Sequence, residues 1–268
     1  MFVMLTLWFS LYVACMLKRV IQMLTLLVVL SVAASVTAEP VPKKLTLAAT
    51  NWCPFICQSP DKKGFVVDYL TELLITKNIE LTVDVLPWSR AIMAARNGQY
   101  DGLLTSTPVE APAFHFPNQA TGTYQMCFFS ANQRVFNYKE RSSLKGMTLG
   151  VVKDYGYGEP LDSVINQPKT DEYILSVASS TPLKQLVNLA KVRRVDLFVE
   201  DSMVMGHYQL MEHEMDIHQL DCFEKIPFYT AISPNHSAPE ELIALLDELL
   251  SSEQAKKLYL EKQANYTQ

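Results

Sequence analysis

Five histidines are the first residues to consider for catalysis or metal binding, and they are scattered along the chain. They stand at His115, His207, His213, His218 and His236. No His-Glu-x-x-His pattern is present, so their spacing does not predict a zinc site. The sequence also lacks a Gly-x-Ser-x-Gly elbow, a phosphate loop and a dinucleotide fingerprint. Glu200 and Asp201 are adjacent, and adjacent side chains at a strand end point apart rather than sharing a site. We therefore expect no enzyme, no metal and no cofactor.

Aromatic side chains in loops after predicted strands are better suited to holding a small molecule. Trp52 and Phe55 follow the first such strand, Trp88 follows the second, and Tyr155 and Tyr157 follow a later one. Such rings can enclose an apolar or cationic body, with cation–π attraction adding to the contact. The alternative is that they pack beneath their loops, which we favour for Trp88.

Two loops offer backbone and hydroxyl groups at helix starts. The segment Asp154-Tyr155-Gly156-Tyr157-Gly158 contains glycines that let backbone N–H groups approach a ligand closely. Ser179, Ser180 and Thr181 could offer hydroxyls and N–H groups to a ligand, but we favour a role in capping the helix, with Thr181 as N-cap and Pro182 at its first position.

The elements that must position these loops alternate between short β-rich runs and helical runs. This pattern is typical of parallel sheets covered by helices. The first passage predicts strands at 44–50, 80–86 and 100–104, with helices at 64–76 and from 87 to 97. The second predicts strands at 147–152, 172–177 and 195–199, with helices at 159–165, 182–191 and, capped by Asp201, to 211. A strand at 228–233 and one long helix from 238 to 263 follow. The repeated order predicts two α/β lobes.

The chain is expected to cross between these lobes twice, near 126–130 and near 223–229. Lobe 1 would then comprise residues 39–128 and 224–268, and lobe 2 residues 129–223.

Several motifs, taken in order, resemble those of the extracellular solute-binding proteins of family 3. These are type II periplasmic binding proteins that serve polar amino-acid ABC transporters. The motifs are Trp52–Phe55, Gly64–Asp68, Leu86–Arg90, Gly98–Gly102, Thr107-Pro108 with Phe116, Leu144–Gly146 and Val195–Asp201. The resemblance implies two lobes, each a mostly parallel sheet flanked by helices, joined by a two-strand hinge and closing on a small polar solute. It also implies an inner-membrane ABC permease as partner and a monomeric protein.

An acidic residue stands where this family usually has an arginine. Members of the family place that arginine three residues after the threonine equivalent to Thr107, where it grips a ligand carboxylate. Here the position is Glu110. Asp201 matches the acid that the family uses for the ligand's ammonium, and Thr105 and Thr107 match its binding loop. Two acids without the arginine indicate a cationic or carbohydrate-like solute. Arg90 is the alternative carboxylate clamp.

Structural roles that involve no ligand remain possible for these residues. Arg90 could form a surface ion pair, Glu110 could be a solvated loop residue, and Asp201 could serve only as a helix N-cap. Two other functions also stay open: a ligand-binding partner of a membrane signalling protein, and a dehydratase-like enzyme in the same cleft.

The first 38 residues have the features of a cleaved signal peptide. Lys18 and Arg19 precede an apolar run, and Val36 and Ala38 occupy the −3 and −1 positions of a cleavage site. Met16 is an alternative start, and one long anchor or two short membrane passes are the alternatives to cleavage. Cleavage predicts a periplasmic protein. The net charge of −5 gives no electrostatic reason to bind nucleic acid.

Four cysteines follow this segment, at Cys53, Cys57, Cys127 and Cys222. An even count in an oxidising compartment favours disulfides over a metal site. Cys53 and Cys57 flank three residues of one loop, so a local bridge is expected. Cys127 can pair with Cys222 only if their strands come together, which the sequence leaves open.

Overall fold

The computed structural model describes residues 43–59, 61–167 and 173–266. Residues 41–268 form one compact unit, which contains two five-stranded sheets. We call each sheet with its helices a lobe. Within the described residues, none of the helices combines the length and the apolar character needed to cross a membrane. The predicted signal peptide and its alternative start at Met16 lie outside the described residues.

The first sheet has five strands, and its inner strand β1 (Lys44–Ala49) is apolar on both faces. The strand order is β2 (Glu80–Val85), β1, β3 (Gly102–Ser106), β10 (Ile226–Ile232) and β4 (Gly122–Tyr124). Strands β2, β1 and β3 are parallel, and β10 runs antiparallel to β3 and β4. Leu45 and Leu47 of β1 pack in one core cluster, and Ala48 packs in another. This alternation follows from the two-residue period of a strand and shows that both faces of the sheet are covered.

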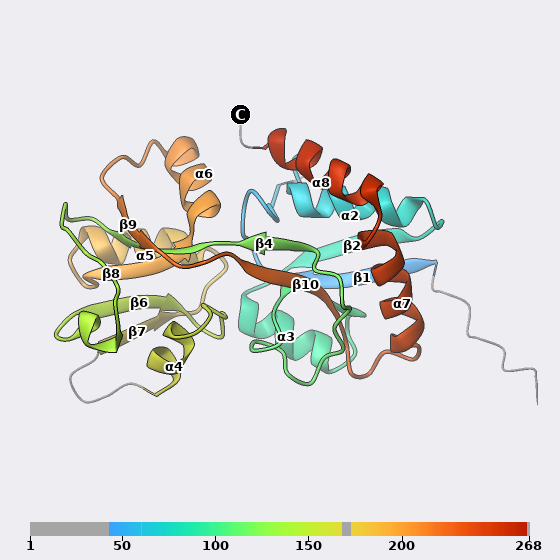
Figure 1. Cartoon of the computed structure of the whole chain (residues 1–268), viewed down its shortest axis with the longest axis horizontal. Helices are drawn as coiled ribbons and strands as arrows, with labels where there is room; N and C mark the ends of the chain where they lie inside the picture. Colours follow the sequence, from blue (N-terminus) through green and yellow to red (C-terminus); the bar gives the residue numbers. More distant parts are fainter. Residues whose placement is uncertain (1–42, 60, 168–172, 267–268) are drawn as a thin grey trace, which may run out of the picture. The chain divides into compact units, whose positions relative to one another are not determined.

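Helices cover both faces of the first sheet (Figure 1). Helices α2 (Phe65–Ile75) and α8 (Glu253–Ala264) lie together on one face, and α3 (Trp88–Arg96) lies on the other. The single helix predicted over 238–263 is wrong. It is divided into α7 (Pro239–Leu250) and α8, because the Ser252 hydroxyl accepts the N–H of Ala255 at 3.1 Å and caps a new helix.

The second sheet repeats the arrangement of the first. Its order is β7 (Tyr173–Val177), β6 (Thr148–Val152), β8 (Leu197–Asp201), β5 (Met126–Ser130) and β9 (His218–Cys222). The first three are parallel, and β5 is antiparallel to its neighbours. The helical elements are η1 (Arg141–Leu144), α4 (Leu161–Asn166), α5 (Pro182–Lys191) and α6 (Ser202–Glu212). Thr181 occupies the N-cap position of α5 and Pro182 follows it, as predicted, but the Thr181 side chain makes no capping hydrogen bond.

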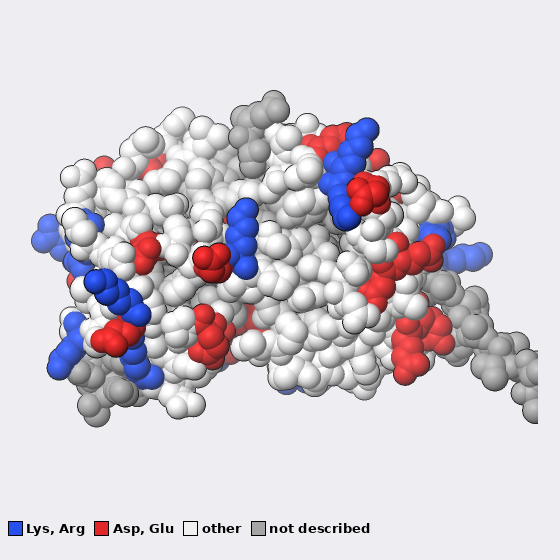
Figure 2. Space-filling model, viewed as in Figure 1, with Lys and Arg blue, Asp and Glu red and all other residues white. Residues whose placement is uncertain are grey.

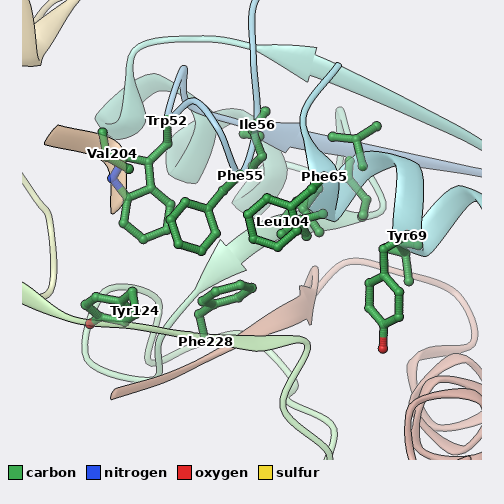
Figure 3. Packing of buried hydrophobic residues seen from close by; sticks show 14 of the residues in the cluster. Trp52, Phe55, Ile56, Phe65, Tyr69, Leu104, Tyr124, Val204 and Phe228 are labelled. Atoms are coloured by element: carbon green, nitrogen blue, oxygen red, sulfur yellow. The ribbon is translucent and has the colours of Figure 1, made fainter. Parts of the chain in front are cut away.

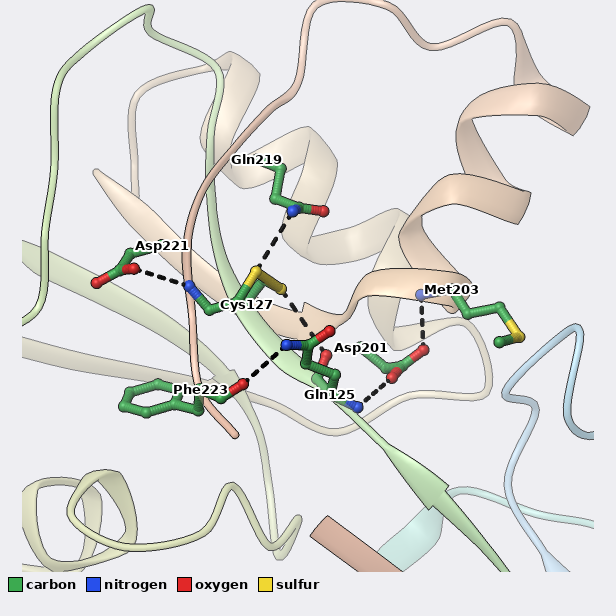
Figure 4. Close-up of a disulfide and its surroundings, with 8 residues drawn as sticks. Gln125, Cys127, Asp201, Met203, Gln219, Asp221 and Phe223 are labelled. Atoms are coloured by element: carbon green, nitrogen blue, oxygen red, sulfur yellow. Dashed lines mark hydrogen bonds between the residues drawn. A yellow bond between two sulfur atoms is a disulfide. The ribbon is translucent and has the colours of Figure 1, made fainter. Parts of the chain in front are cut away.

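The chain crosses between the sheets at Gln125 and at residues 223–225. Strand β4 belongs to the first sheet and β5 lies wholly in the second, so the boundary expected at residue 128 would cut β5. The Gln125 N–H donates to Asp201 Oδ2 at 2.7 Å, and its side-chain amide donates to the Phe223 carbonyl at 3.0 Å (Figure 4). The two crossing strands are therefore tied to each other and to the start of α6.

Two disulfides are present, and both involve residues that the sequence singled out. Cys53 and Cys57 form the expected local bridge. Cys127 and Cys222 face each other across β5 and β9, and they form the second bridge (Figure 4). The sheet thus supplies the strand contact that the sequence could not show.

The charged side chains are mixed over the visible surface. On the face shown in Figure 2, several Asp and Glu side chains gather near α7 at the right-hand end, whereas the Lys and Arg side chains of the described residues form no continuous basic patch. This distribution gives no electrostatic footprint for nucleic acid on that face.

Candidate functional site

The loops that follow the central strands of both lobes meet around a small cavity of about 20 Å³. This is room for about one water molecule. The cavity is lined by Thr50, Trp52, Trp88, Thr105, Glu110, Tyr124, Met126, Tyr155 and Gly156. Most of these residues follow the carboxyl ends of β1, β3 and β6, where ligands bind in open α/β sheets. The lobes are therefore closed on each other at the expected site.

Glu110 joins the two lobes through its carboxyl group. Its Oε2 accepts the Thr107 N–H at 2.7 Å and the Thr107 hydroxyl at 2.9 Å, both in the first lobe. Its Oε1 accepts the Gly156 N–H of the second lobe at 3.0 Å. Glu110 can reach both partners because a helical turn after β3 brings it back over Thr107. It also lines a larger cavity of about 400 Å³ on one side of the cleft, which leaves it partly exposed.

A second carboxyl group bridges the lobes beside Trp52. The Trp52 indole N–H of the first lobe donates to Glu200 Oε1 of the second at 2.8 Å. The Tyr124 hydroxyl adds a third link, because it donates to the Gly156 carbonyl at 2.9 Å. Glu200 is 1% exposed, so it is more completely removed from water than Glu110.

Burial changes the acidity of these groups. Desolvation raises the pKa of Glu110 and of Glu200 to about 7, against the opposing effect of their hydrogen bonds. The pKa of Asp201 is raised to about 6 for the same reason. Closure therefore makes Glu110 and Glu200 easier to protonate, and a positively charged group placed beside either one would favour its ionised form.

Aromatic rings form the walls of the cavity. Trp52 stacks on Phe55 at 4.4 Å and meets Tyr124 edge to face at 5.7 Å (Figure 3). Trp88 of the first lobe meets Tyr155 of the second edge to face at 6.3 Å. The Trp88 indole N–H is buried without a hydrogen-bond partner among the described residues. The Tyr155 hydroxyl is also buried, opposite Thr50 but outside good hydrogen-bond geometry. Both groups can donate to a molecule that enters.

Strained backbone flanks the cavity in each lobe. Thr105 has φ 64° at the end of β3, and Asp154 has φ 63° after β6. A β-branched residue rarely adopts the left-handed region. Strain of this kind persists where surrounding structure enforces it, which is often at a functional site.

Asp201 does not face the cavity, contrary to the prediction that it would meet a cation there. Its Oδ1 accepts the N–H groups of Met203 and Val204 at 2.8 and 3.0 Å, and its Oδ2 accepts the Gln125 N–H. The predicted N-cap role is thus confirmed. Asp201 is 1% exposed and lines none of the cavities described, so a solute in the cleft does not reach its carboxylate.

The other predicted site residues divide into those at the cavity and those away from it. Trp52, Thr105, Glu110 and Tyr155 line the cavity, and Thr107 lies beside it through Glu110. Phe55 and Tyr157 are buried in the cores, at 0% and 1% exposure, because their rings support Trp52 and the β6 strand end. Arg90 and Ser180 are exposed and line none of the cavities described. Arg90 is therefore not placed as a clamp for a solute in this cleft.

Sequence reasoning missed Thr50 and Tyr124, considered Glu200 only as a neighbour of Asp201, and considered Gly156 only as a flexible backbone group. Tyr124 lies just before the hinge crossing, and Glu200 lies just before the Asp201 N-cap. Only the pairing of the strands shows that both side chains reach the cleft. Within the described residues, no cluster of three or more His, Cys, Asp or Glu side chains could hold a metal ion.

Comparison with known proteins identifies the fold. No protein-family model matches the sequence, and no curated protein matches it. Among solved structures, an ancestral arginine-binding protein bound to arginine aligns with a TM-score of 0.69 at 15% identity, over 85% of this chain and 99% of that chain. A histidine kinase sensor domain with similarity to periplasmic binding proteins aligns at 0.68 and 14% identity, over 83% and 95%. An amino-acid ABC transporter substrate-binding protein from Streptococcus pneumoniae, bound to L-arginine, aligns at 0.65 and 16% identity, over 84% and 97%.

These neighbours are mostly amino-acid-binding proteins, which is the type that the sequence motifs resemble. At these identities the likeness shows the fold, and the predicted two-lobed binding-protein architecture is confirmed.

Proposed function

We propose that this protein is an exported solute-binding protein that captures a small polar solute carrying a positive charge. The observation that carries the proposal is Glu110, which reaches the junction of the lobes among the rings of Trp52, Trp88 and Tyr155. A carboxylate surrounded by aromatic faces is suited to a cation. The absence of an arginine at this position argues against a solute recognised by its carboxylate alone.

The hydrogen bonds of Glu110 leave room for one more donor. An ionised carboxyl group offers about four acceptor positions, and Thr107 and Gly156 take three of them. The indole N–H of Trp88, which lines the same cavity, supplies a donor for a polar atom of the solute. The site therefore matches an amino-acid-like or amine solute.

The closed cavity is far smaller than an amino acid, so the lobes must separate to admit the solute. Separation breaks the Glu110–Gly156 and Trp52–Glu200 hydrogen bonds. The solute then stabilises whichever arrangement it binds more tightly. We infer that a monomeric protein in the periplasm, freed of residues 1–38, delivers the solute to an inner-membrane ABC permease. We infer no enzymatic activity.

Binding is tested by calorimetry and thermal unfolding with L-arginine, L-lysine, agmatine, L-glutamate and glucose. We expect a cationic compound to bind, and at 100 times its dissociation constant it should stabilise the protein by about 2.7 kcal/mol. Glu110→Gln should weaken that binding at least tenfold. The matched control is Glu72→Gln, because Glu72 pairs with Lys262 at 2.6 Å on the first lobe. Binding of L-glutamate alone would contradict the proposal.

A role as the binding partner of a membrane sensor is the second candidate, and the similarity to a histidine kinase sensor domain favours it. A neighbouring permease gene would support transport, and a neighbouring sensor kinase or cyclase gene would support signalling.

A further inference from the structure

A second cavity lies in the cleft on the far side of Trp52. Its volume is about 310 Å³, which is in the range of pockets that hold small molecules. It is bounded by the 51–59 loop of the first lobe and, in the second lobe, by the start of α5 and by one side of α6 along its length. We call it the outer pocket. Unlike the cavity at Glu110, it is large enough for an amine of amino-acid size while the lobes stay closed.

Glu200 supplies a buried acceptor to the outer pocket. Both hydrogen bonds to its carboxyl group, from the Trp52 indole N–H and from the Asp201 N–H at 2.9 Å, end on Oε1. Oε2 has no partner among the described residues. Glu200 is 1% exposed and lines the pocket. Oε2 is nearly but not fully buried and borders the pocket, so an ammonium group that enters can donate a charge-assisted hydrogen bond to it.

The walls of the outer pocket are mostly apolar. They are formed by Trp52, Pro182, Leu183, Val204, Tyr208 and Met211, together with the Cys53–Cys57 disulfide. These groups can cover the body of a molecule whose charged end meets Glu200. The combination of one buried polar anchor with apolar walls is typical of a small-molecule site.

The other charged groups of the outer pocket leave Glu200 as its one uncompensated charge among the described residues. Lys184 and Glu212 pair with each other at 3.5 Å at the rim. His207 contacts Cys53 Sγ at 3.2 Å. Burial, together with the charge of Lys62, lowers the pKa of His207 and keeps the ring neutral at pH 7. The pocket therefore attracts a cation rather than an anion.

We propose that the outer pocket binds a small amphipathic amine, with its ammonium group donating to Glu200 Oε2 and its apolar part packed against Trp52, Leu183 and Val204. The inference does not depend on which solute binds beside Glu110. It adds a second binding position to the same cleft.

The probe is 2-phenylethylamine, with 2-phenylethanol as its uncharged counterpart. Binding is followed by the NMR signals of the indole N–H groups, because the Trp52 indole is bonded to Glu200 and the Trp88 indole lies in the other cavity. We expect the amine to move the Trp52 signal while the Trp88 signal stays in place, and the alcohol to bind at least tenfold more weakly. A shift of the Trp88 signal alone would assign the amine to the Glu110 cavity and overturn the inference.

Variants extend the test. Glu200→Gln keeps an acceptor for Trp52 but removes the charge, and it should weaken amine binding at least tenfold. Glu248→Gln is the matched control, because Glu248 pairs with Lys77 at 2.7 Å on the first lobe. If Glu200→Gln fails to fold, Leu183→Trp tests the same site by filling it, and it should also abolish the Trp52 shift. Equal binding of the amine by the wild type and by the variant that folds would overturn the inference, as would no shift of either indole signal at millimolar amine.

Discussion

Glu110 and Glu200 make the closed form sensitive to pH at the level of single residues. Their pKa of about 7 in the folded protein lies above the ordinary value of 4.5. Between these values the folded protein holds more protons than the unfolded chain, so its stability falls as pH rises. The stabilising contribution is fully present below pH 4.5 and is lost as pH rises through 7. Asp201 acts in the same direction, whereas the lowered pKa of His207 acts in the opposite one.

We expect the free energy of unfolding to decrease from pH 5 to pH 8. Replacing Glu200 by Gln removes the part of this decrease that Glu200 causes. For a pKa raised from 4.5 to about 7, that part is on the order of 3 kcal/mol. The measurement is urea unfolding at several pH values, with Glu248→Gln as control. The wild type should lose more stability over this range than Glu200→Gln. Parallel curves for the two proteins would show that Glu200 ionises as freely when folded as when unfolded.

At the scale of elements, the two disulfides differ in how much chain they enclose. Cys53 and Cys57 are separated by 4 positions, and Cys127 and Cys222 by 95. A cross-link limits the freedom of the unfolded chain more when it closes a longer loop. The second bridge also holds β5 to β9 beside the hinge crossings.

We therefore expect the Cys127→Ala, Cys222→Ala double variant to lose about 5 kcal/mol of stability and the Cys53→Ala, Cys57→Ala double variant about 2 kcal/mol. Urea unfolding of both under oxidising conditions checks the order. A larger loss of stability in the Cys53, Cys57 variant would mean that the short bridge stabilises the protein mainly by holding Trp52 and the wall of the outer pocket in place.

The central elements could be predicted from the sequence because their apolar residues recur at the period of a strand or a helix. Strands β1, β2, β6 and helix α2 follow this rule. Strand β9 carries His, Gln and Asp, so its composition does not predict a strand. It forms one because it pairs with β5. The division between α7 and α8 depends on one serine hydroxyl, whose capping bond a continuous helical pattern conceals.

The site was predictable only in part, because its geometry depends on contacts between distant segments. The position of Glu110 followed from the resemblance to family 3, but its bond to Gly156 spans 46 residues. Asp201 and Glu200 exchange the roles that a linear reading suggests: Asp201 turns to the hinge, and Glu200 turns to the cleft. Adjacent residues at a strand end point to opposite sides, so the choice between them requires the orientation of β8.

At the scale of the whole molecule, closure depends on the lack of a side chain at Gly156. A Cβ atom there would lie 2.8 Å from Thr107 Oγ1 and 3.0 Å from Glu110 Cγ, across the two lobes.

Gly156→Ala should therefore oppose closure without disturbing either core. Overpacking of this kind costs about 1–3 kcal/mol, which lowers the ratio of closed to open molecules by a factor between about 5 and about 150. Gly206→Ala is the matched control, since no atom from beyond its own stretch of α6 lies within 4 Å of its added Cβ. We expect small-angle X-ray scattering to give a larger radius of gyration for Gly156→Ala than for Gly206→Ala, with the same helix content by circular dichroism. Equal radii would mean that the contact of Glu110 with Gly156 does not control the separation of the lobes.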